Sequence, residues 1–134
     1  MKYFLDTNII IYAIKGTFPA LSLHFRKIPS QSIVIPLVVM AEIEYGAQKS
    51  INYNATIEKY RRFTDVFPKI GLSQNATVQY GRIRKSLEKT DTPIGPNDLI
   101  IASSVLAEGG TLVTHNIKKF CRVPDLQIED WTEV

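Results

Sequence analysis

The sequence predicts an α/β fold, a three-layer α/β/α sandwich around a mainly parallel four- to five-stranded sheet, formed by residues 1–134 as a single domain. Two features predict it. Short runs rich in β-branched residues alternate with longer segments of helical periodicity, which is the pattern of βαβ units with right-handed crossovers. No repeat, low-complexity tract or linker divides the chain, and 45% hydrophobic and 22% charged residues are typical of a globular domain.

The first half of the chain is predicted to contain two strands and four helices. In chain order these are strand Lys2–Leu5, helices Ile9–Ile14 and Ala20–Lys27, strand Ser32–Ile35, and helices Leu37–Lys49 and Ala55–Asp65. We expect Thr7 or Asn8 to cap the first helix and Gly16 to end it. Pro36 suits the first turn of the third helix, because an N–H at that position has no partner within the helix.

The second half continues the same alternation. Ser73 is expected to cap a helix whose apolar side chains recur at helical spacing, namely Ala76, Tyr80, Ile83 and Leu87. The other expected elements are a strand near Pro68–Leu72, a loop at Thr90–Pro96, a helix from a capping Asn97 through Leu106, a strand at Thr111–Thr114 and an edge strand at Gln127–Glu129. Gly109 and Gly110 should end the helix that precedes the Thr111–Thr114 strand.

Composition excludes several classes of protein. The single cysteine, Cys121, allows no internal disulfide and no thiol cluster for zinc. The first residues reach a charge too early for a signal peptide, and no apolar run approaches the roughly 20 residues of a membrane span. We therefore expect a cytoplasmic protein without a membrane partner. A net charge of +3 and a pI of about 9.0 are compatible with nucleic-acid binding.

Four oxygen-bearing side chains are predicted to lie at one edge of the sheet, just past the carboxyl ends of strands. Asp6 directly follows the first strand, and Asn116 follows strand Thr111–Thr114. Glu42 falls within an apolar stripe of its helix, and Asp98 lies in the first turn of another. Each acid has a purely structural alternative, because Asp6 and Asp98 could simply stabilise a helix N-terminus and Glu42 could reach solvent.

Taken together, the four side chains predict a metal site. Carboxylate and amide oxygens without His or Cys suit hard cations, so we expect Mg²⁺, or alternatively Mn²⁺, to be bound by Asp6, Glu42, Asp98 and Asn116. Such an ion polarises a phosphoryl group and lowers the pKa of a bound water. Hydrolysis of a phosphodiester is therefore the natural reaction for this set of residues.

Five segments, in order, resemble PIN-domain ribonucleases, specifically the VapC toxins of VapBC toxin–antitoxin systems. They are Leu5–Asn8, Ala41–Ala47, Ile94–Ala102, Val113–Asn116 and Val123–Trp131. The resemblance runs the length of the chain and implies a Mg²⁺-dependent endoribonuclease with Asp6, Glu42 and Asp98 as catalytic acidic ligands. It also implies that Thr7, Asn8 and Thr114 support these ligands or line the site.

The resemblance further implies three partners: a structured RNA substrate such as tRNA, a VapB-like antitoxin, and a second copy of the chain in a homodimer. Apolar residues of the N-terminal helices are expected to supply a groove for the antitoxin or a dimer contact, namely Ile10, Ile14, Leu21 and Phe25. Two positions depart from the family. Asn116 is neutral where many PIN domains have a fourth acid, and Lys119 replaces a glutamate found in many relatives. Both changes argue against a tightly held second metal ion.

Two groups of basic residues remain open to more than one interpretation. Lys118, Lys119 and Arg122 closely follow Asn116, where they could bind substrate phosphates or simply face solvent. Arg82, Lys85 and Lys89 share one face of a helix, which is either a solvated surface or a track for the RNA backbone, with Arg84 nearby.

Other functions fit the sequence less well. A phosphoacceptor signalling domain needs adjacent acids after the first strand, and a haloacid-dehalogenase-like phosphatase needs a second Asp where Asn8 stands. The stronger alternative is a PIN-fold domain that binds RNA or a partner without cleaving it.

Overall fold

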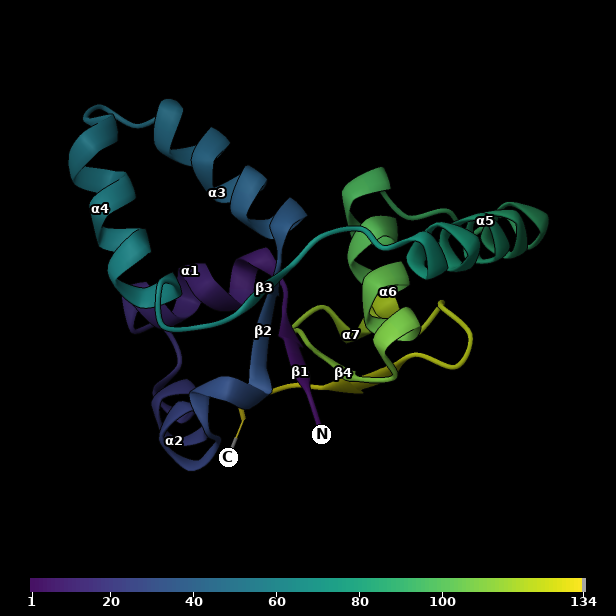
Figure 1. The fold of residues 1–134 in the computed structure, drawn as a ribbon, viewed down its shortest axis with the longest axis horizontal. Coiled ribbons are helices and arrows are strands. Elements are labelled where there is room, and N and C mark those ends of the chain that lie inside the picture. The colour runs from purple at the N-terminus through teal and green to yellow at the C-terminus, as the bar shows by residue number, and fades with distance from the viewer. Residues whose placement is uncertain (134) are drawn as a thin grey trace.

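The computed structural model describes residues 1–133, in which strands and helices alternate along the chain (Figure 1). In chain order the elements are β1 (Tyr3–Leu5), α1 (Thr7–Lys15), α2 (Pro19–Lys27), a 3₁₀ turn (Ser30–Ser32), β2 (Ile33–Pro36), α3 (Leu37–Gln48), α4 (Tyr53–Thr64), β3 (Lys69–Ile70), α5 (Gln74–Lys89), α6 (Pro96–Glu108), β4 (Thr111–Val113), α7 (Ile117–Phe120) and β5 (Gln127–Glu129).

The strands described within residues 1–133 form one sheet in the order β3-β2-β1-β4-β5, and every pairing is parallel. The predicted α/β class is confirmed, and the sheet reaches the upper end of the expected strand number. Strand β1 lies at its centre, with Phe4 opposite Val34 of β2 and Leu5 opposite Val113 of β4. Because all strands run the same way, the segments that follow β1, β2 and β4 begin at the same edge.

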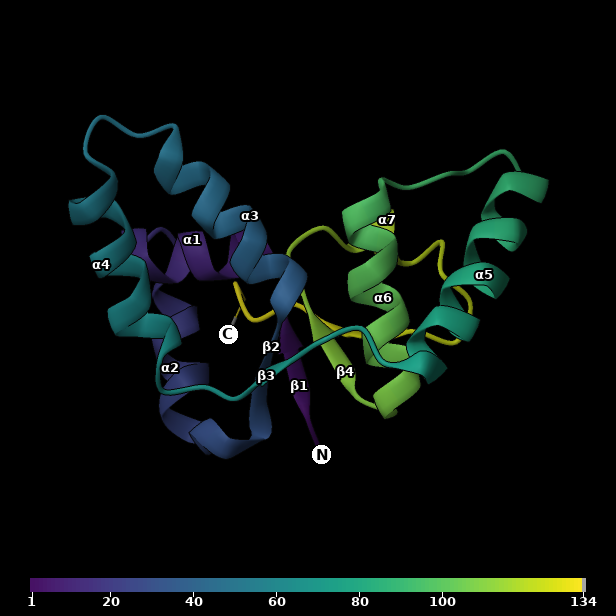
Figure 2. The same cartoon turned by 45° about the horizontal axis from the view of Figure 1, so that its top comes forward.

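Helices cover both faces of this sheet. Helices α1, α2 and α4 lie on one side and α5 and α6 on the other, while α3 stands between α4 and α6 (Figures 1 and 2). Strands β1, β2 and β4 are almost wholly buried, as expected for parallel strands covered on both faces. Trp131, beyond β5, is also buried, and its ring contacts those of Tyr3, His24 and Phe25.

Helix boundaries correct two of the predicted caps. Asp6, rather than Thr7 or Asn8, caps α1, because its Oδ1 accepts a hydrogen bond from the Ile9 N–H at 3.0 Å. Gly95, rather than Asn97, caps α6, because Pro96 takes the first helical position, where its fixed φ and missing N–H are no disadvantage. Ser73 caps α5 as predicted, through a hydrogen bond from the Ala76 N–H.

The ends of α6 and the interior of α1 and α2 show how closely the elements pack. Gly109 ends α6 with a φ of 69°, and the next residue, Gly110, lies so close to Phe4 that a Cβ atom there would overlap its ring.

The predicted apolar groove on the N-terminal helices is wrong in part, because Ile10 and Leu21 are fully buried in the core. None of the helices described in residues 1–133 combines the length and the hydropathy that crossing a membrane requires.

Candidate active site

Asp6 occupies the centre of the candidate site. It follows the central strand, and its side chain is only 6% exposed. Its Oδ2 accepts a hydrogen bond from the Thr114 hydroxyl at 2.5 Å, while Oδ1 accepts the bond from the Ile9 N–H. Thr114 follows β4, the neighbour of β1, and its Oγ1 in turn accepts a bond from the Asn116 N–H at 3.0 Å. Two adjacent strands therefore hold one carboxylate in a fixed orientation.

The environment of Asp6 disfavours its negative charge. The pKa of Asp6 is raised from its ordinary value of 3.8 to about 6, mainly because the carboxylate is buried and in smaller part because of the negative charge of Asp98. Hydrogen bonds from Thr114 and the Ile9 N–H, and the positive charge of Lys119, act in the opposite direction but do not compensate. A cation close to Asp6 would remove this penalty.

Asp98 lies in the first turn of α6 and contributes to the same electrostatic field. The Nζ of Lys119, on α7, donates a hydrogen bond to its Oδ2 at 2.8 Å. Both side chains are partly exposed, at 25% for Asp98 and 35% for Lys119. The Lys119 ammonium group is thus the counter-ion of the Asp98 carboxylate.

Glu42 faces the site from the middle of α3. The Thr7 hydroxyl, one residue from Asp6, donates to its Oε1 at 2.5 Å, and the Asn97 amide, one residue from Asp98, lies 3.5 Å from its Oε2. Glu44 points elsewhere, because it forms an ion pair with Arg61 and accepts a bond from Tyr53 on α4. Of the two acids on α3, Glu42 is therefore the one that belongs to this site.

Asn116 and Asn8 complete the edge of the site. Asn116 caps α7, since its Oδ1 accepts a bond from the Lys119 N–H at 3.2 Å. A hollow of about 250 Å³ is lined by Asp6, Asn8, Tyr12, His115 and Asn116. The sequence assigned no role in the site to Tyr12 or His115, and it predicted Asn97 only as a helix cap. Only the position of Asn97 beside Asp98 offered a signal for any of them.

The side chain of His115 is held in place at the rim of this hollow. Its Nδ1 lies 3.0 Å from Oδ2 of Asp130 and 3.0 Å from the hydroxyl of Thr132. Its ring contacts the rings of Tyr12 and Phe18. The C-terminal segment therefore fixes one wall of the site.

The donor chemistry of the site fits a hard cation. No three of the Asp, Glu, His or Cys side chains described in residues 1–133 are gathered closely enough to form a ready metal-binding group. Mg²⁺, however, is commonly held by one or two carboxylates, with water and phosphate oxygens as its remaining ligands. Asp6, with its penalised charge, and Asp98, with an ammonium beside it, are such a pair. Glu42 is tied instead to Thr7 and Asn97.

Comparison with known proteins identifies the family of this chain. The family model of the PIN domain matches residues 3–126. Ribonuclease VapC2 of Rickettsia felis is 40% identical over 135 residues, covering 98% of both chains. The tRNA(fMet)-specific endonuclease VapC of Salmonella typhimurium is 31% identical over 131 residues, also covering 98% of each.

Solved structures agree. The crystal structure of VapBC2 from Rickettsia felis, bound to a DNA fragment from its promoter, matches 98% of this chain with a TM-score of 0.91 and 38% identity, over 99% of that chain. VapBC-1 from nontypeable Haemophilus influenzae matches 99% of this chain with a TM-score of 0.90 and 35% identity, over 100% of that chain. The chain belongs to the PIN-domain family, within its VapC group.

Proposed function

We propose that this protein is a metal-dependent endoribonuclease, the toxin of a VapBC-type pair, and that its substrate is a structured RNA such as tRNA. The observation that carries the proposal is the buried Asp6 carboxylate, whose pKa is raised to about 6 beside the charge of Asp98. Such a carboxylate is stabilised by a cation and is poorly explained as a helix cap alone. The names of the relatives, ribonuclease VapC2 and tRNA(fMet)-specific endonuclease VapC, support the same activity.

The geometry of the site supports a proposal for the metal-binding residues. Asp6 and Asp98 would hold Mg²⁺ or Mn²⁺. Glu42 and the side-chain amide oxygen of Asn116 would be further ligands, either directly or through water. The ion supplies a Lewis acid for the phosphoryl oxygen and lowers the pKa of the attacking water. Thr114 keeps Asp6 oriented through its 2.5 Å hydrogen bond, and Thr7 does the same for Glu42.

Other residues would act on the RNA itself. Lys119 can move from Asp98 to a substrate phosphate, because its side chain is flexible and 35% exposed. Lys118 is exposed on the same short helix and provides a second cation for the backbone. Asn8, exposed at the rim of the hollow, offers an amide for hydrogen bonds to the RNA.

Cleavage of RNA tests the proposal directly. Asp6→Asn and Asp98→Asn should each lower the rate on tRNA with Mg²⁺ or Mn²⁺ by at least about a hundredfold, because a lost ligand costs several kcal/mol in the transition state. Asp65→Asn, a change of the same charge at the exposed residue that caps the C-terminus of α4, is the matched control and should retain full activity. Near-normal cleavage by both site variants would refute the proposal.

A domain that binds RNA without cleaving it is the second candidate. The ion pair of Lys119 with Asp98 favours it, because the ammonium competes for a ligand position. The same assay separates the two, since a binding domain retains tRNA at every Mn²⁺ concentration and releases no cleaved product. Mapping the ends of RNA cleaved in cells after brief induction would then identify the target.

We further propose a VapB-like antitoxin as partner and a homodimer as the assembled state. The related structures of Rickettsia felis and Haemophilus influenzae are described as VapBC2 and VapBC-1. An Arg or Lys of the antitoxin is expected to enter among Asp6, Glu42 and Asp98. Equal binding of the antitoxin to an Asp6→Asn/Asp98→Asn double variant would contradict this ionic contact.

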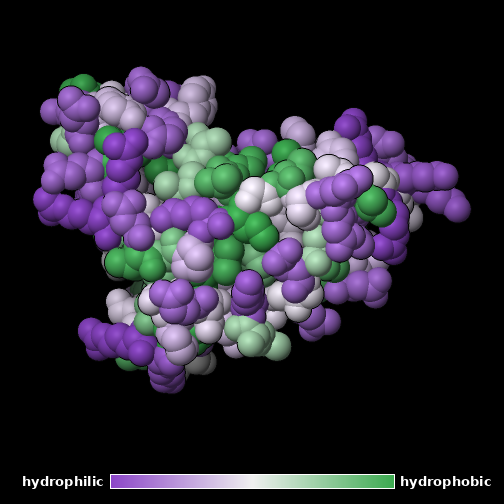
Figure 3. Space-filling view, in the orientation of Figure 1, coloured by the Kyte–Doolittle hydropathy of each residue, from purple (hydrophilic) through white to green (hydrophobic). Residues whose placement is uncertain are grey.

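An apolar hollow of about 340 Å³ fits the dimer contact better than the N-terminal helices do. It is lined by residues of β2, α3, α6 and β3 and of the segment just after β3, and its exposed members include Leu37 and Leu72. In Figure 3, apolar side chains form a band across the middle of the face on which β3 lies.

A further inference from the structure

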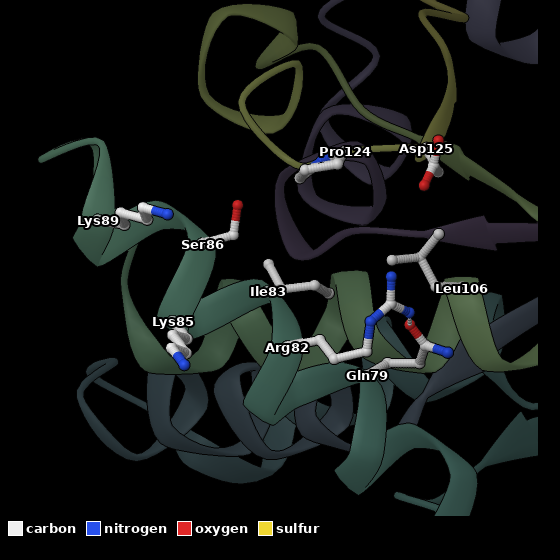
Figure 4. Close-up of a pocket in the computed structure, with 9 residues that line it drawn as sticks. All are labelled: Gln79, Arg82, Ile83, Lys85, Ser86, Lys89, Leu106, Pro124 and Asp125. Carbon is white, nitrogen blue, oxygen red and sulfur yellow. Dashed lines mark hydrogen bonds between the residues drawn. The ribbon is translucent and has the colours of Figure 1, made fainter.

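A further hollow lies away from the carboxylates. It measures about 580 Å³, against about 250 Å³ for the hollow beside Asp6. Helix α5 forms one wall, and Pro124 and Asp125, from the segment before β5, face it from across the hollow (Figure 4). The proposed catalytic residues take no part in it, so its chemistry needs an explanation of its own.

Three cations line the α5 wall. Arg82, Lys85 and Lys89 are spaced by three and four residues, so they share one face of the helix. Within residues 1–133, Lys85 and Lys89 form no ion pair, and the one side-chain bond of Arg82 is its 2.8 Å bond to the neutral Gln79. Like charges at this spacing repel by a few tenths of a kcal/mol per pair, so the arrangement costs stability unless an anion binds.

The rest of the lining is part apolar and part polar, with Ile83, Leu106 and Pro124 beside the neutral Gln79. Arg84, on the adjoining face of α5, forms an ion pair with Glu88 at 3.3 Å, so in the part of the chain that the structure describes the cations of α5 that have no acidic partner are the three that line the hollow. Ser86 adds a neutral hydroxyl, and Asp125 is the single carboxylate among the lining residues. No aromatic side chain takes part in the lining, whereas protein interfaces are enriched in aromatic anchors. The hollow is therefore better suited to phosphates than to an apolar peptide.

The hollow is connected to the proposed active site. Residues 90–95 lead from Lys89, at the end of α5, directly to the first turn of α6, where Asp98 lies. Arg122, just past α7, donates a hydrogen bond to the carbonyl oxygen of Pro93 in this connection at 3.2 Å. Arg122 thus lies beside the segment that joins the basic face of α5 to the first turn of α6.

We infer that this hollow binds the sugar–phosphate backbone of a structured RNA at a distance from the scissile bond. The eight residues from Arg82 to Lys89 span about 10 Å of helix, which matches about three phosphates of an A-form-like strand. Backbone contacts of this kind recognise the shape of a folded RNA and not its sequence. The inference rests on the proposed ribonuclease function and explains how a small domain favours folded over short substrates.

The test compares two triple variants on two RNAs. Arg82→Gln/Lys85→Gln/Lys89→Gln removes the charges of the hollow. Arg26→Gln/Lys27→Gln/Lys59→Gln removes three exposed charges from α2 and α4 and is the matched control. The substrates are unfractionated tRNA and a single-stranded oligonucleotide of about eight residues that carries the mapped cleavage site. Circular dichroism and melting temperature establish that both variants fold.

The hollow variant should lose about 10- to 100-fold in kcat/KM on tRNA at low salt and retain wild-type cleavage of the oligonucleotide. Its logarithmic salt dependence of tRNA binding should be shallower by about 2 to 3, because three phosphate contacts are lost. The control variant should match the wild type in both. Unchanged cleavage of tRNA by the hollow variant, or an equal loss on both RNAs, overturns the inference.

Two further outcomes are distinguishable. If wild-type protein cleaves neither RNA, the proposed function fails. Retention of tRNA on a filter still tests the hollow in that case, because only the hollow variant should bind tRNA more weakly than the wild type. If the hollow variant loses its co-purifying antitoxin but binds and cleaves tRNA normally, the hollow is a protein-binding site and the inference is wrong.

Discussion

Replacing Lys119 should strengthen metal binding in the absence of RNA. Its Nζ lies 2.8 Å from Oδ2 of Asp98, so a divalent ion on the same carboxylate would be within about 5 Å of this ammonium. At an effective dielectric near 20, the repulsion is on the order of 6 to 7 kcal/mol. The flexible lysine will swing away instead, so the measurable cost is that of releasing it from Asp98.

The strength of the contact between Lys119 and Asp98 sets the size of the change in metal affinity. A charge-assisted bond between partly exposed groups is worth about 1 to 2 kcal/mol, which corresponds to roughly 5- to 30-fold in affinity. Lys119→Ala should therefore tighten Mn²⁺ binding by about this factor. Lys119→Glu should tighten it further, because it also adds a negative charge. Lys119→Arg keeps the charge and should leave the affinity close to that of the wild type.

Calorimetric titration with Mn²⁺ measures these affinities and the number of ions bound. Lys118→Glu makes the same change of charge on the neighbouring exposed residue of α7, away from the ion pair, and is the matched control. The wild type should bind one ion weakly. Equal tightening by Lys118→Glu and Lys119→Glu would show that only net charge matters, and two comparable Mn²⁺ sites in the RNA-free wild type would refute the reasoning.

Three further predictions concern Asp6 and its surroundings. The pKa of Asp6 is raised to about 6 in the folded metal-free protein, so the folded state keeps a proton that the unfolded chain loses near pH 4. The free energy of unfolding should therefore fall by up to about 3 kcal/mol as the pH rises from 4 to 6. Asp6→Asn should flatten this dependence in urea titrations at several pH values, and an unchanged slope would contradict it. Saturating Mn²⁺ should raise the melting temperature more at pH 7.5 than at pH 5, where protons compete for Asp6, and Asp98→Asn should reduce the effect. Thr114→Val removes the hydroxyl that bonds both Asp6 and the Asn116 N–H, so it should destabilise the fold by about 1 to 3 kcal/mol and raise the pKa of Asp6 further; Thr114→Ser should restore both.

The strands and their common edge could be predicted from the sequence because both depend on local patterns. Buried parallel strands are short β-branched runs, and the rule that sites follow their carboxyl ends places Asp6 and Asn116 together. Strand β5 was predicted as an edge strand and is one. Thr114 and Asp6 come together because β4 and β1 are neighbours in the sheet and both residues directly follow these strands.

Contacts between elements could not be predicted in this way. Helix α7 has only four residues, too few to show a periodic pattern, and it was missed. Without α7, nothing in the sequence placed the Lys119 ammonium on Asp98, 21 residues earlier. The caps failed for a related reason, because Asp6, Thr7 and Asn8 are all good capping residues and only the full backbone path decides among them.

The hydrogen bond between Thr114 and Asp6 joins residues 108 positions apart in the chain. Asp6 is among the first residues to leave the ribosome, but its hydroxyl partner follows the fourth strand, so the carboxylate stays in water until β4 has docked against β1. Contacts of such long range form late in folding. A nascent chain that carries β1 and α3 therefore has Asp6 and Glu42 but not the assembled candidate site, which forms only with the last strands of the sheet. Under the proposed function, this delay leaves time for an antitoxin to be present before RNA can be cleaved.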